Sequence, residues 1–346
     1  TWSGFVHEVS TDHPLFTPIW WAPAGDLVPG DYLATARRLP IEGRDLLPDG
    51  LPSFAGLMIG DGACHDACRF SGREATKPEA RIELDRIAAV MGWGLTRVRL
   101  EVDITGRGKE GPRAWLLRLR LNCRSRDKRV PPQIFTAPND QVAEFLAWYF
   151  YCDGTVSERL MLAEYDSVSL GLLQDVKHLL LRFGVVSVLR RKQSRYLGKS
   201  YESWRLILRS TFLDAFARHI PVAGHKGLAL KRLAGRPCAR NTNVDIIPNG
   251  WQRYLLHGAR WHANRGVRWG QNRTGNGREA VRRVADNEGN ETLRRLATSD
   301  IFWDRVVSVE NLGEQPVWNI EVPGTHTFIA DGGVISHNTT GGIYAC

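Results

Sequence analysis

Hydrophobic residues fall into short runs separated by turn-forming residues, and two of these runs resemble each other. Residues 54–62 and residues 146–154 are apolar, and each ends in Asp-Gly. We predict a buried helix for each run, because small residues let a second helix approach closely and glycine ends a helix. The two acids, Asp61 and Asp153, then lie at the ends of these helices.

A second element recurs at nearly the same distance after each acid. It reads cation-x-aliphatic-proline, and it begins at Lys128, 67 positions after Asp61 (128 minus 61), and at Arg218, 65 positions after Asp153 (218 minus 153). We interpret this as an internal duplication. Packing the two helices together would bring two carboxylates close, which is tolerable if a proton or a divalent cation lies between them. For either run alone, a core helix that ends in Asp-Gly is the alternative.

Alternating apolar and basic residues predict strands with one cationic face. This pattern ends the stretch 113–121, and we expect the same role for residues 190–192 and 204–209 in the second half. Residues 172–184 instead predict an amphipathic helix closed by glycine. We expect the cationic side chains to contact phosphates, with solvated strand faces as the alternative. They are Arg118, Arg120, Arg190, Arg191, Lys192, Arg205, Arg209 and Arg218.

Both ends of the chain are predicted to be β-rich. Residues 1–47 are punctuated by turns, and residues 301–338 return to β character. In the tail, the runs 317–322 and 325–335 predict strands broken by Pro-Gly and by Asp-Gly-Gly. Residues 236–297 mix tryptophan with arginine, which suits contact with a nucleic-acid backbone but equally suits a solvated linker.

The tail places His337, Asn338 and Thr339 at a predicted strand end. An asparagine side chain can attack its own backbone carbonyl, close a succinimide and cut the peptide bond that follows. This reaction needs a proton donor beside the bond, and His337 is the adjacent side chain whose pKa is closest to neutral. Thr339 supplies a hydroxyl nucleophile. Taken alone, the triplet also fits a polar turn.

Composition narrows the class of protein. The 346 residues can bury a sizeable core, and a net charge of +9 favours a polyanionic partner. We expect a cytosolic protein, because the longest apolar run is too short to cross a membrane and no signal sequence opens the chain. Six scattered cysteines agree with a reducing compartment. Cys64, His65 and Cys68 could form half of a zinc site, but no second pair follows.

The tail resembles the carboxy-terminal splicing motifs of inteins. These motifs combine a His-x-Phe strand, a hydrophobic pair, a penultimate His, a terminal Asn and a downstream nucleophile, which correspond here to His326, 334–335, His337, Asn338 and Thr339. The early segment resembles the family's Thr-x-x-His element, with Ser10 and His13 as the pair. By this resemblance, residues 339–346 begin the host protein. The family's first nucleophile would precede Thr1, so an amino-terminal piece is either omitted or supplied by another chain.

Residues 50–235 resemble LAGLIDADG homing endonucleases, on the two Asp-Gly motifs and the repeated element. The resemblance implies two αββαββα halves, motif helices at a pseudo-twofold interface and sheets that saddle double-stranded DNA. It also implies that Asp61 and Asp153 bind Mg²⁺ and that Lys128 is the active-site lysine. Arg218 is then its counterpart in the second half.

Together these patterns predict an α+β chain in which a β-rich Hint horseshoe is interrupted by the endonuclease. The expected divisions are 1–47, 48–235, 236–297, 298–338 and 339–346. Its function would be self-splicing together with cutting of both DNA strands. The expected partners are DNA, a host protein in cis and an amino-terminal intein piece in trans, with no membrane and a monomeric state. The rivals are a non-cleaving DNA-binding regulator and a processing domain that only cleaves itself.

Overall fold

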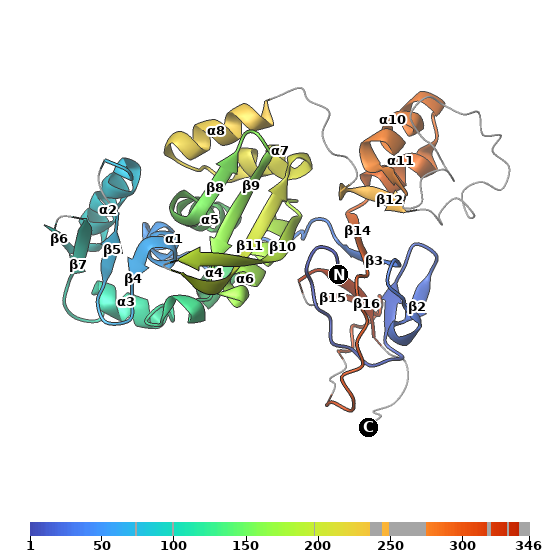
Figure 1. The fold of residues 1–346 in the computed structure, drawn as a ribbon, viewed down its shortest axis with the longest axis horizontal. Helices are drawn as coiled ribbons and strands as arrows, with labels where there is room; N and C mark the ends of the chain where they lie inside the picture. Colours follow the sequence, from blue (N-terminus) through green and yellow to red (C-terminus); the bar gives the residue numbers. More distant parts are fainter. Residues whose placement is uncertain are drawn as a thin grey trace. The chain divides into compact units, whose positions relative to one another are not determined.

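The ends and the middle of the chain fold as two units in the computed structural model (Figure 1). The structure describes residues 1–72, 75–98, 100–196, 198–235, 244–248, 275–316, 320–330 and 332–338. The terminal unit takes Thr1–Leu39 with Ala239–Cys346, and the central unit takes Pro40–Cys238. The division therefore falls after residues 39 and 238, where the sequence suggested 47 and 235.

The terminal unit is built on one sheet that joins both ends of the chain. Its strand order is β14-β3-β16-β1-β2, with β15 paired to β16. Strand β16, from the tail, thus lies between two strands from the first 40 residues, as expected for a fold closed by its tail. The strands are β1 (Pro14–Phe16), β2 (Trp21–Pro23), β3 (Tyr32–Ala36), β14 (Ile301–Arg305), β15 (Thr327–Ala330) and β16 (Val334–His337).

The predicted hairpin at the tail is confirmed, but the strand before it is not. Strands β15 and β16 pair antiparallel across the Asp-Gly-Gly turn. Of the run 317–322 predicted as that strand, residues 317–319 lie outside the described residues, residues 320–322 are not in a strand, and Ile320 is exposed. An exposed side chain such as that of Ile320 is not packed against a neighbouring strand, so β-forming composition alone does not decide the structure of residues 320–322.

A small layer of strands and helices packs on this sheet. It holds β12 (Ile246–Pro248), β13 (Gly275–Gly277), α10 (Arg278–Glu288) and α11 (Glu291–Thr298). The core residues Val281, Ala285 and Leu293 pack with Trp303 of β14. Arg278 is buried and donates hydrogen bonds to Asp245 and to carbonyls in the last turn of α11 and just after it. These parts of 236–297 are folded, while the tryptophan-rich stretch 249–274 lies outside the described residues.

The central unit repeats one order of elements twice, which confirms the predicted duplication. Its sheets have the orders β4-β5-β7-β6 and β8-β9-β11-β10, so equivalent strands take equivalent places. The first half contains α1 (Leu51–Asp61), β4 (Gly62–Ala63), β5 (Arg69–Ser71), α2 (Pro78–Met91), β6 (Gly94–Val98), β7 (Glu101–Thr105) and α3 (Pro112–Arg118). The second contains α5 (Asn139–Asp153), β8 (Gly154–Ser157), β9 (Leu162–Ser167), α6 (Leu170–Leu181), β10 (Ser187–Tyr196), β11 (Lys199–Arg209) and α7 (Ser210–His219).

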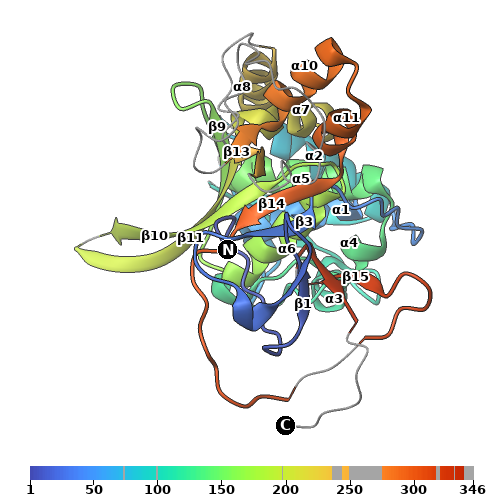
Figure 2. The same ribbon diagram turned by 90° about the vertical axis from the view of Figure 1, so that its right-hand side faces the viewer.

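Two further helices belong to this unit. The short helix α4 (Pro132–Thr136) precedes α5, and α8 (Gly224–Ala234) follows α7. Strands β10 and β11 form a long hairpin, which Figure 2 shows projecting from the rest of the unit. The predicted amphipathic helix is α6, which begins after the capping Ser169. Among the described residues, none of the helices combines the length and apolarity that a membrane crossing needs.

The two motif helices pack against each other, as predicted. A Cβ built on Gly56 would lie 2.6 Å from the carbonyl oxygen of Phe145 and 2.9 Å from Cβ of Trp148. A Cβ on Gly60 would lie 2.3 Å from Cβ of Cys152. Because real Cβ atoms do not come this close, the two glycines set the distance between the helices.

The predicted strand at 113–121 is wrong. Residues 112–118 form helix α3, which begins with Pro112 after Gly111. Proline is favourable at the first position of a helix, where its missing N–H costs no hydrogen bond. The alternating pattern reflects instead the burial of Leu116, Leu119 and Leu121 along a helix and the turn that follows it.

Candidate functional site

The acids Asp61 and Asp153 lie at the adjoining ends of α1 and α5. A Cβ on Gly60 would lie 3.7 Å from Oδ2 of Asp153, so this carboxylate faces the last turn of the opposite helix. Burial raises the pKa of Asp153 to about 6, and the negative charge of Asp61 contributes to the rise. The two acids therefore share one electrostatic site.

Lys128 holds the end of the first motif helix. Its side chain is buried, and Nζ donates hydrogen bonds to the carbonyl oxygens of Met58 (2.8 Å), Ile59 (2.8 Å) and Gly62 (3.0 Å). The last carbonyls of a helix have no partner within the helix and carry its negative partial charge. The Lys128 ammonium group donates hydrogen bonds to these carbonyls, balances their negative partial charge and remains beside Asp61.

Lys226, from helix α8, makes the same kind of contact in the second half. Its Nζ donates to the carbonyl oxygens of Tyr151 (2.6 Å) and Cys152 (3.2 Å), and it reaches that of Phe150 at 3.5 Å. Burial lowers the pKa of this ammonium group. The site thus holds two buried or half-buried lysines, one for each helix end.

The structure corrects the expected counterpart of Lys128. Arg218 belongs to the last turn of α7, whereas Lys226 contacts the carbonyls at the end of α5. The repeated cation-x-aliphatic-proline element pointed to Arg218 because it lies at nearly the same distance after Asp153 as Lys128 lies after Asp61. The similar spacing of the two halves does not extend beyond this element. Lys226 comes from α8, which follows the second repeat, and no spacing rule in the sequence singles it out.

A hollow of about 350 Å³ extends from Asp153 to the second sheet. It is lined by Gly60, Lys128 and Asp153 from the helix ends and by Asp166 and Lys192 from the sheet. Side chains from both halves thus meet in one depression that contains acids and cations. A charged ligand placed in it would touch the motif helices and the sheet at once.

The cations of the second sheet divide between its two faces. Arg190 lies opposite Arg205 in the β10–β11 register, and Lys192 lies opposite Ser203. Because successive side chains alternate in a strand, Arg191 points to the other face. There it pairs with Glu202. The expected triplet 190–192 therefore does not act as one basic patch.

Acids accompany the cations on the face that reaches the hollow. Lys192 pairs with Asp166 at 2.9 Å, and Arg205 pairs with Glu164 at 3.4 Å. Arg209 lies on β11 four residues after Arg205 and so shares its face. This face of the sheet therefore carries both acidic and basic side chains and is not uniformly basic.

Arg118 and Arg120 do not lie on a sheet, because the segment that holds them is helical. Arg118 ends α3, where its guanidinium pairs with Glu110 at 3.0 Å and lies 4.5 Å above the ring of Trp115. Arg120 follows the helix with a positive φ of 54°. The predicted cationic sheet face of the first half is therefore absent at these positions.

A second site surrounds Asn338 in the terminal unit. Nδ1 of His337 donates to the carbonyl oxygen of Asn338 at 2.7 Å, because a carbonyl can only accept. The side-chain amide of Asn338 lies 3.2 Å from Nδ1 of His326. Asn338 is 4% exposed, and its Oδ1 has no hydrogen-bond partner among the described residues. Thr339 lies outside the described residues.

The sheet also brings His13 against the tail strand β15. The ring of His13 lies edge-on to Phe328 of β15 at 6.4 Å, and its backbone N–H donates to the carbonyl of Ser10 at 3.1 Å. The rings of His326 and His337 lie 6.0 Å apart. Residues from the first 40 positions thus meet the tail, as the sequence predicted.

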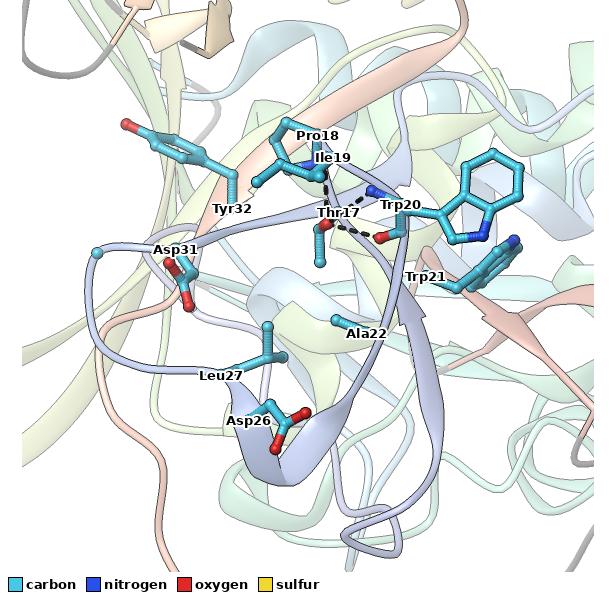
Figure 3. A pocket seen from close by; sticks show the side chains of 11 residues that line it. Thr17, Pro18, Ile19, Trp20, Trp21, Ala22, Asp26, Leu27, Asp31 and Tyr32 are labelled. Carbon is cyan, nitrogen blue, oxygen red and sulfur yellow. Dashed lines mark hydrogen bonds between the residues drawn. The ribbon is translucent and has the colours of Figure 1, made fainter. Parts of the chain in front are cut away.

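Beside this site, the loop between β1 and β3 encloses a hollow of about 420 Å³ (Figure 3). The hydroxyl of Thr17 accepts from the N–H of Trp20 and donates to its carbonyl, which holds the loop tip in a turn. Trp21 lines the hollow and also lies edge-on to His337, with 5.2 Å between ring centres. The hollow therefore borders the asparagine site without containing it.

The alternative zinc site has no support in the described residues. Burial raises the pKa of Cys64 to about 11 and that of Cys68 to about 12, which disfavours the thiolates that zinc needs. No group of three or more His, Cys, Asp or Glu side chains that could hold a metal occurs within the described ranges.

The pair of acids fits Mg²⁺. This cation is usually bound by one or two carboxylates, with water and substrate phosphates as its other ligands. Asp61 and Asp153 supply two carboxylates, and the raised pKa of Asp153 marks a site that gains from a positive charge. Water or phosphate oxygens would then supply the remaining ligands.

Comparison with known proteins identifies one domain. A profile of the LAGLIDADG-like domain matches residues 140–221, which run from α5 to just beyond α7. The chain therefore carries a LAGLIDADG-like domain in its central unit. Among solved structures, mesophilic variants of the homing endonuclease I-DmoI align at a TM-score of 0.34 and 14% identity, over 49% of this chain and 94% of theirs.

Longer matches are found within proteins of different kinds. The chain is 29% identical to the replicative DNA helicase DnaB of Rhodothermus marinus, over 96% of this chain and 39% of the helicase. It is 30% identical to the A subunit of DNA gyrase from Mycolicibacterium flavescens, over 62% of this chain and 40% of the gyrase polypeptide. The chain thus spans about two-fifths of the length of these relatives.

Proposed function

We propose that this chain is an intein that splices itself out of a host protein and carries a site-specific endonuclease that cuts both strands of DNA. The observation that carries the nuclease is the pair of acids at the ends of two packed helices, each end contacted by a lysine. The contacts of Asn338 with two histidines support the splicing activity.

The pattern of similarity supports an inserted element. A helicase and a gyrase are different proteins, yet each contains a segment that is similar to this chain. A segment that recurs within unrelated hosts is what an intein predicts. The host protein would then be the partner in cis.

In the nuclease, Asp61 and Asp153 would hold Mg²⁺ against the DNA backbone. When bound, Mg²⁺ stabilises the charge that develops on the phosphodiester and activates water. Lys128 and Lys226 hold the helix ends and keep positive charge beside the acids. Cations on the sheet would contact phosphates and align the duplex. They include Arg190, Lys192, Arg205 and Arg209, with Arg118, Arg120, Arg191 and Arg218 as peripheral contacts.

In the splicing unit, the side-chain nitrogen of Asn338 would attack the Asn338 carbonyl carbon. The new bond closes a succinimide, and the bond to the nitrogen of Thr339 breaks. His326 faces the attacking nitrogen and can take its proton. His337 donates to the carbonyl oxygen on which charge develops and would supply the proton that the departing Thr339 nitrogen takes up. Ser10 and His13 would act at the upstream junction, and the Thr339 hydroxyl would accept the upstream segment.

One incubation separates this proposal from its rivals. The chain is mixed with Mg²⁺ and a library of DNA duplexes, and cut ends are sequenced, while release of residues 339–346 is followed by mass spectrometry. An intein with its endonuclease gives defined double-strand cuts and peptide release. A non-cleaving DNA-binding regulator gives neither, and a processing domain gives release without DNA cutting.

A further inference from the structure

Lys77 forms an ion pair with the first of the two acids. Its Nζ donates to Oδ2 of Asp61, and both side chains are about one-fifth exposed. Lys77 is the residue that caps the start of α2, so the helix fixes its backbone position. A partly buried ion pair of this kind is screened less than a surface pair.

The second half has no lysine at the equivalent position. The two acids are 92 positions apart, and the residue 92 positions after Lys77 is Ser169. Ser169 occupies the N-cap position of α6 as Lys77 occupies that of α2. The Ser169 hydroxyl accepts from Leu172 N and donates to the carbonyl of Lys128. Among the described residues, no cation lies within ion-pair distance of Asp153.

A second difference between the two halves also concerns the surroundings of Asp61. The thiol of Cys152 is hydrogen-bonded to the Asp61 carboxylate, and the position equivalent to Cys152 in the first half is Gly60, which has no side chain. Asp61 therefore has a cationic and a neutral partner that Asp153 lacks. The two halves share a fold but not the surroundings of their acids.

We propose that Lys77 is a positioning residue that makes the two acids bind divalent cations with unequal affinity. This inference rests on the proposed nuclease function. A cation that approaches Asp61 must first displace the ammonium group of Lys77, which is paired with it directly. The charges of Lys77, Lys128 and Lys226 also act on Asp153, but from beyond ion-pair distance, so a cation there has no bound ammonium group to displace. Cations therefore bind first at Asp153 and then at Asp61, and one DNA strand is nicked before the other is cut.

Manganese binding to the full chain without DNA tests this, because free Mn²⁺ can be counted by electron paramagnetic resonance. The wild type should bind in two unequal steps. Lys77→Met should tighten the weaker step by about threefold to tenfold, the range for a partly exposed ion pair. Lys77→Arg keeps the charge and should retain the two steps, as should Lys109→Met, which removes an exposed lysine elsewhere.

Two acid variants keep the test valid if Lys77→Met does not fold. Asp61→Asn should abolish only the weaker step, and Asp153→Asn only the tighter one. Equal steps in the wild type, or an unchanged weaker step in folded Lys77→Met, would overturn the role of Lys77 and leave the nuclease standing. If the folded wild type binds no Mn²⁺, the acid site itself is wrong and the inference falls with it.

Discussion

The ammonium groups of Lys128 and Lys226 contact equivalent carbonyl groups at the ends of the two motif helices. Met58 and Ile59 accept from the first, and Phe150 and Tyr151, each 92 positions later, accept from the second. The lysines come from different places in the repeat, one before α4 and one from α8. The same chemical need, a cation at the end of a helix beside an acid, is thus met from two different segments.

This relationship predicts that Lys226 matters more for DNA cutting than Arg218 does. Lys226→Met should lower the cutting rate by about a hundredfold, because charge stabilisation near the phosphodiester is lost. Lys231→Met, an exposed lysine on the same helix, should have no effect. Cutting is measured on a linear duplex with a single site. A larger loss in Arg218→Gln than in Lys226→Met would reverse the assignment.

The glycines between the motif helices predict a stability effect. Gly56→Ala places a Cβ against the backbone of α5, so the helices must separate, at a cost of about 1–3 kcal/mol in the free energy of unfolding. Gly235→Ala is the control, because its nearest atom lies 3.4 Å from the new Cβ. Urea unfolding measures both. Equal stabilities of the two variants would contradict the close helix contact.

The sequence predicted the motif helices and the duplication because their packing depends on local features. Gly56, Gly60 and the Asp-Gly ends belong to short runs that can be compared directly. The prediction failed at 113–121, where alternation was taken for a strand although Pro112 favours the start of a helix. It also missed Lys226 and Lys77, since each reaches its acid or helix end through tertiary packing rather than by a repeated spacing.

The pKa of Asp153 predicts how stability depends on pH without metal. In EDTA, folded Asp153 keeps its proton up to about pH 6, while the unfolded group loses it near 3.8. The folded state therefore binds more protons between these values, and stability falls as pH rises through this window. Asp153→Asn removes this penalty and should be more stable than wild type at pH 8 by roughly 3 kcal/mol.

The difference in the free energy of unfolding between wild type and Asp153→Asn should vanish below pH 4, where Asp153 is protonated in both the folded and the unfolded state. Urea unfolding of wild type and variant at pH 3.5 and pH 8 measures it. A constant difference across this range would mean that the substitution acts through packing rather than through the charge.

The asparagine site predicts cleavage that depends on Asn338 and on its two histidines. Asn338→Ala removes the attacking nitrogen and should abolish release of the segment after residue 338. His337→Ala should slow release by about a hundredfold, because the donor to the carbonyl oxygen is lost. Mass spectrometry of a fusion after residue 338 follows both. Ser336→Ala, a neighbouring substitution on β16, should not slow release; release by Asn338→Ala at the wild-type rate would rule out succinimide formation.

The central claim is that Asp61 and Asp153 form one cation-dependent site for cutting DNA. The most direct measurement is the conversion of supercoiled plasmid to nicked and linear forms in Mg²⁺ by the parent chain and by three variants. We predict linear product from the parent, nicked or uncut plasmid from Asp61→Asn and Asp153→Asn, and no product from the double variant, although all four remain folded. Linear product at equal rates from the parent and the double variant would contradict the claim.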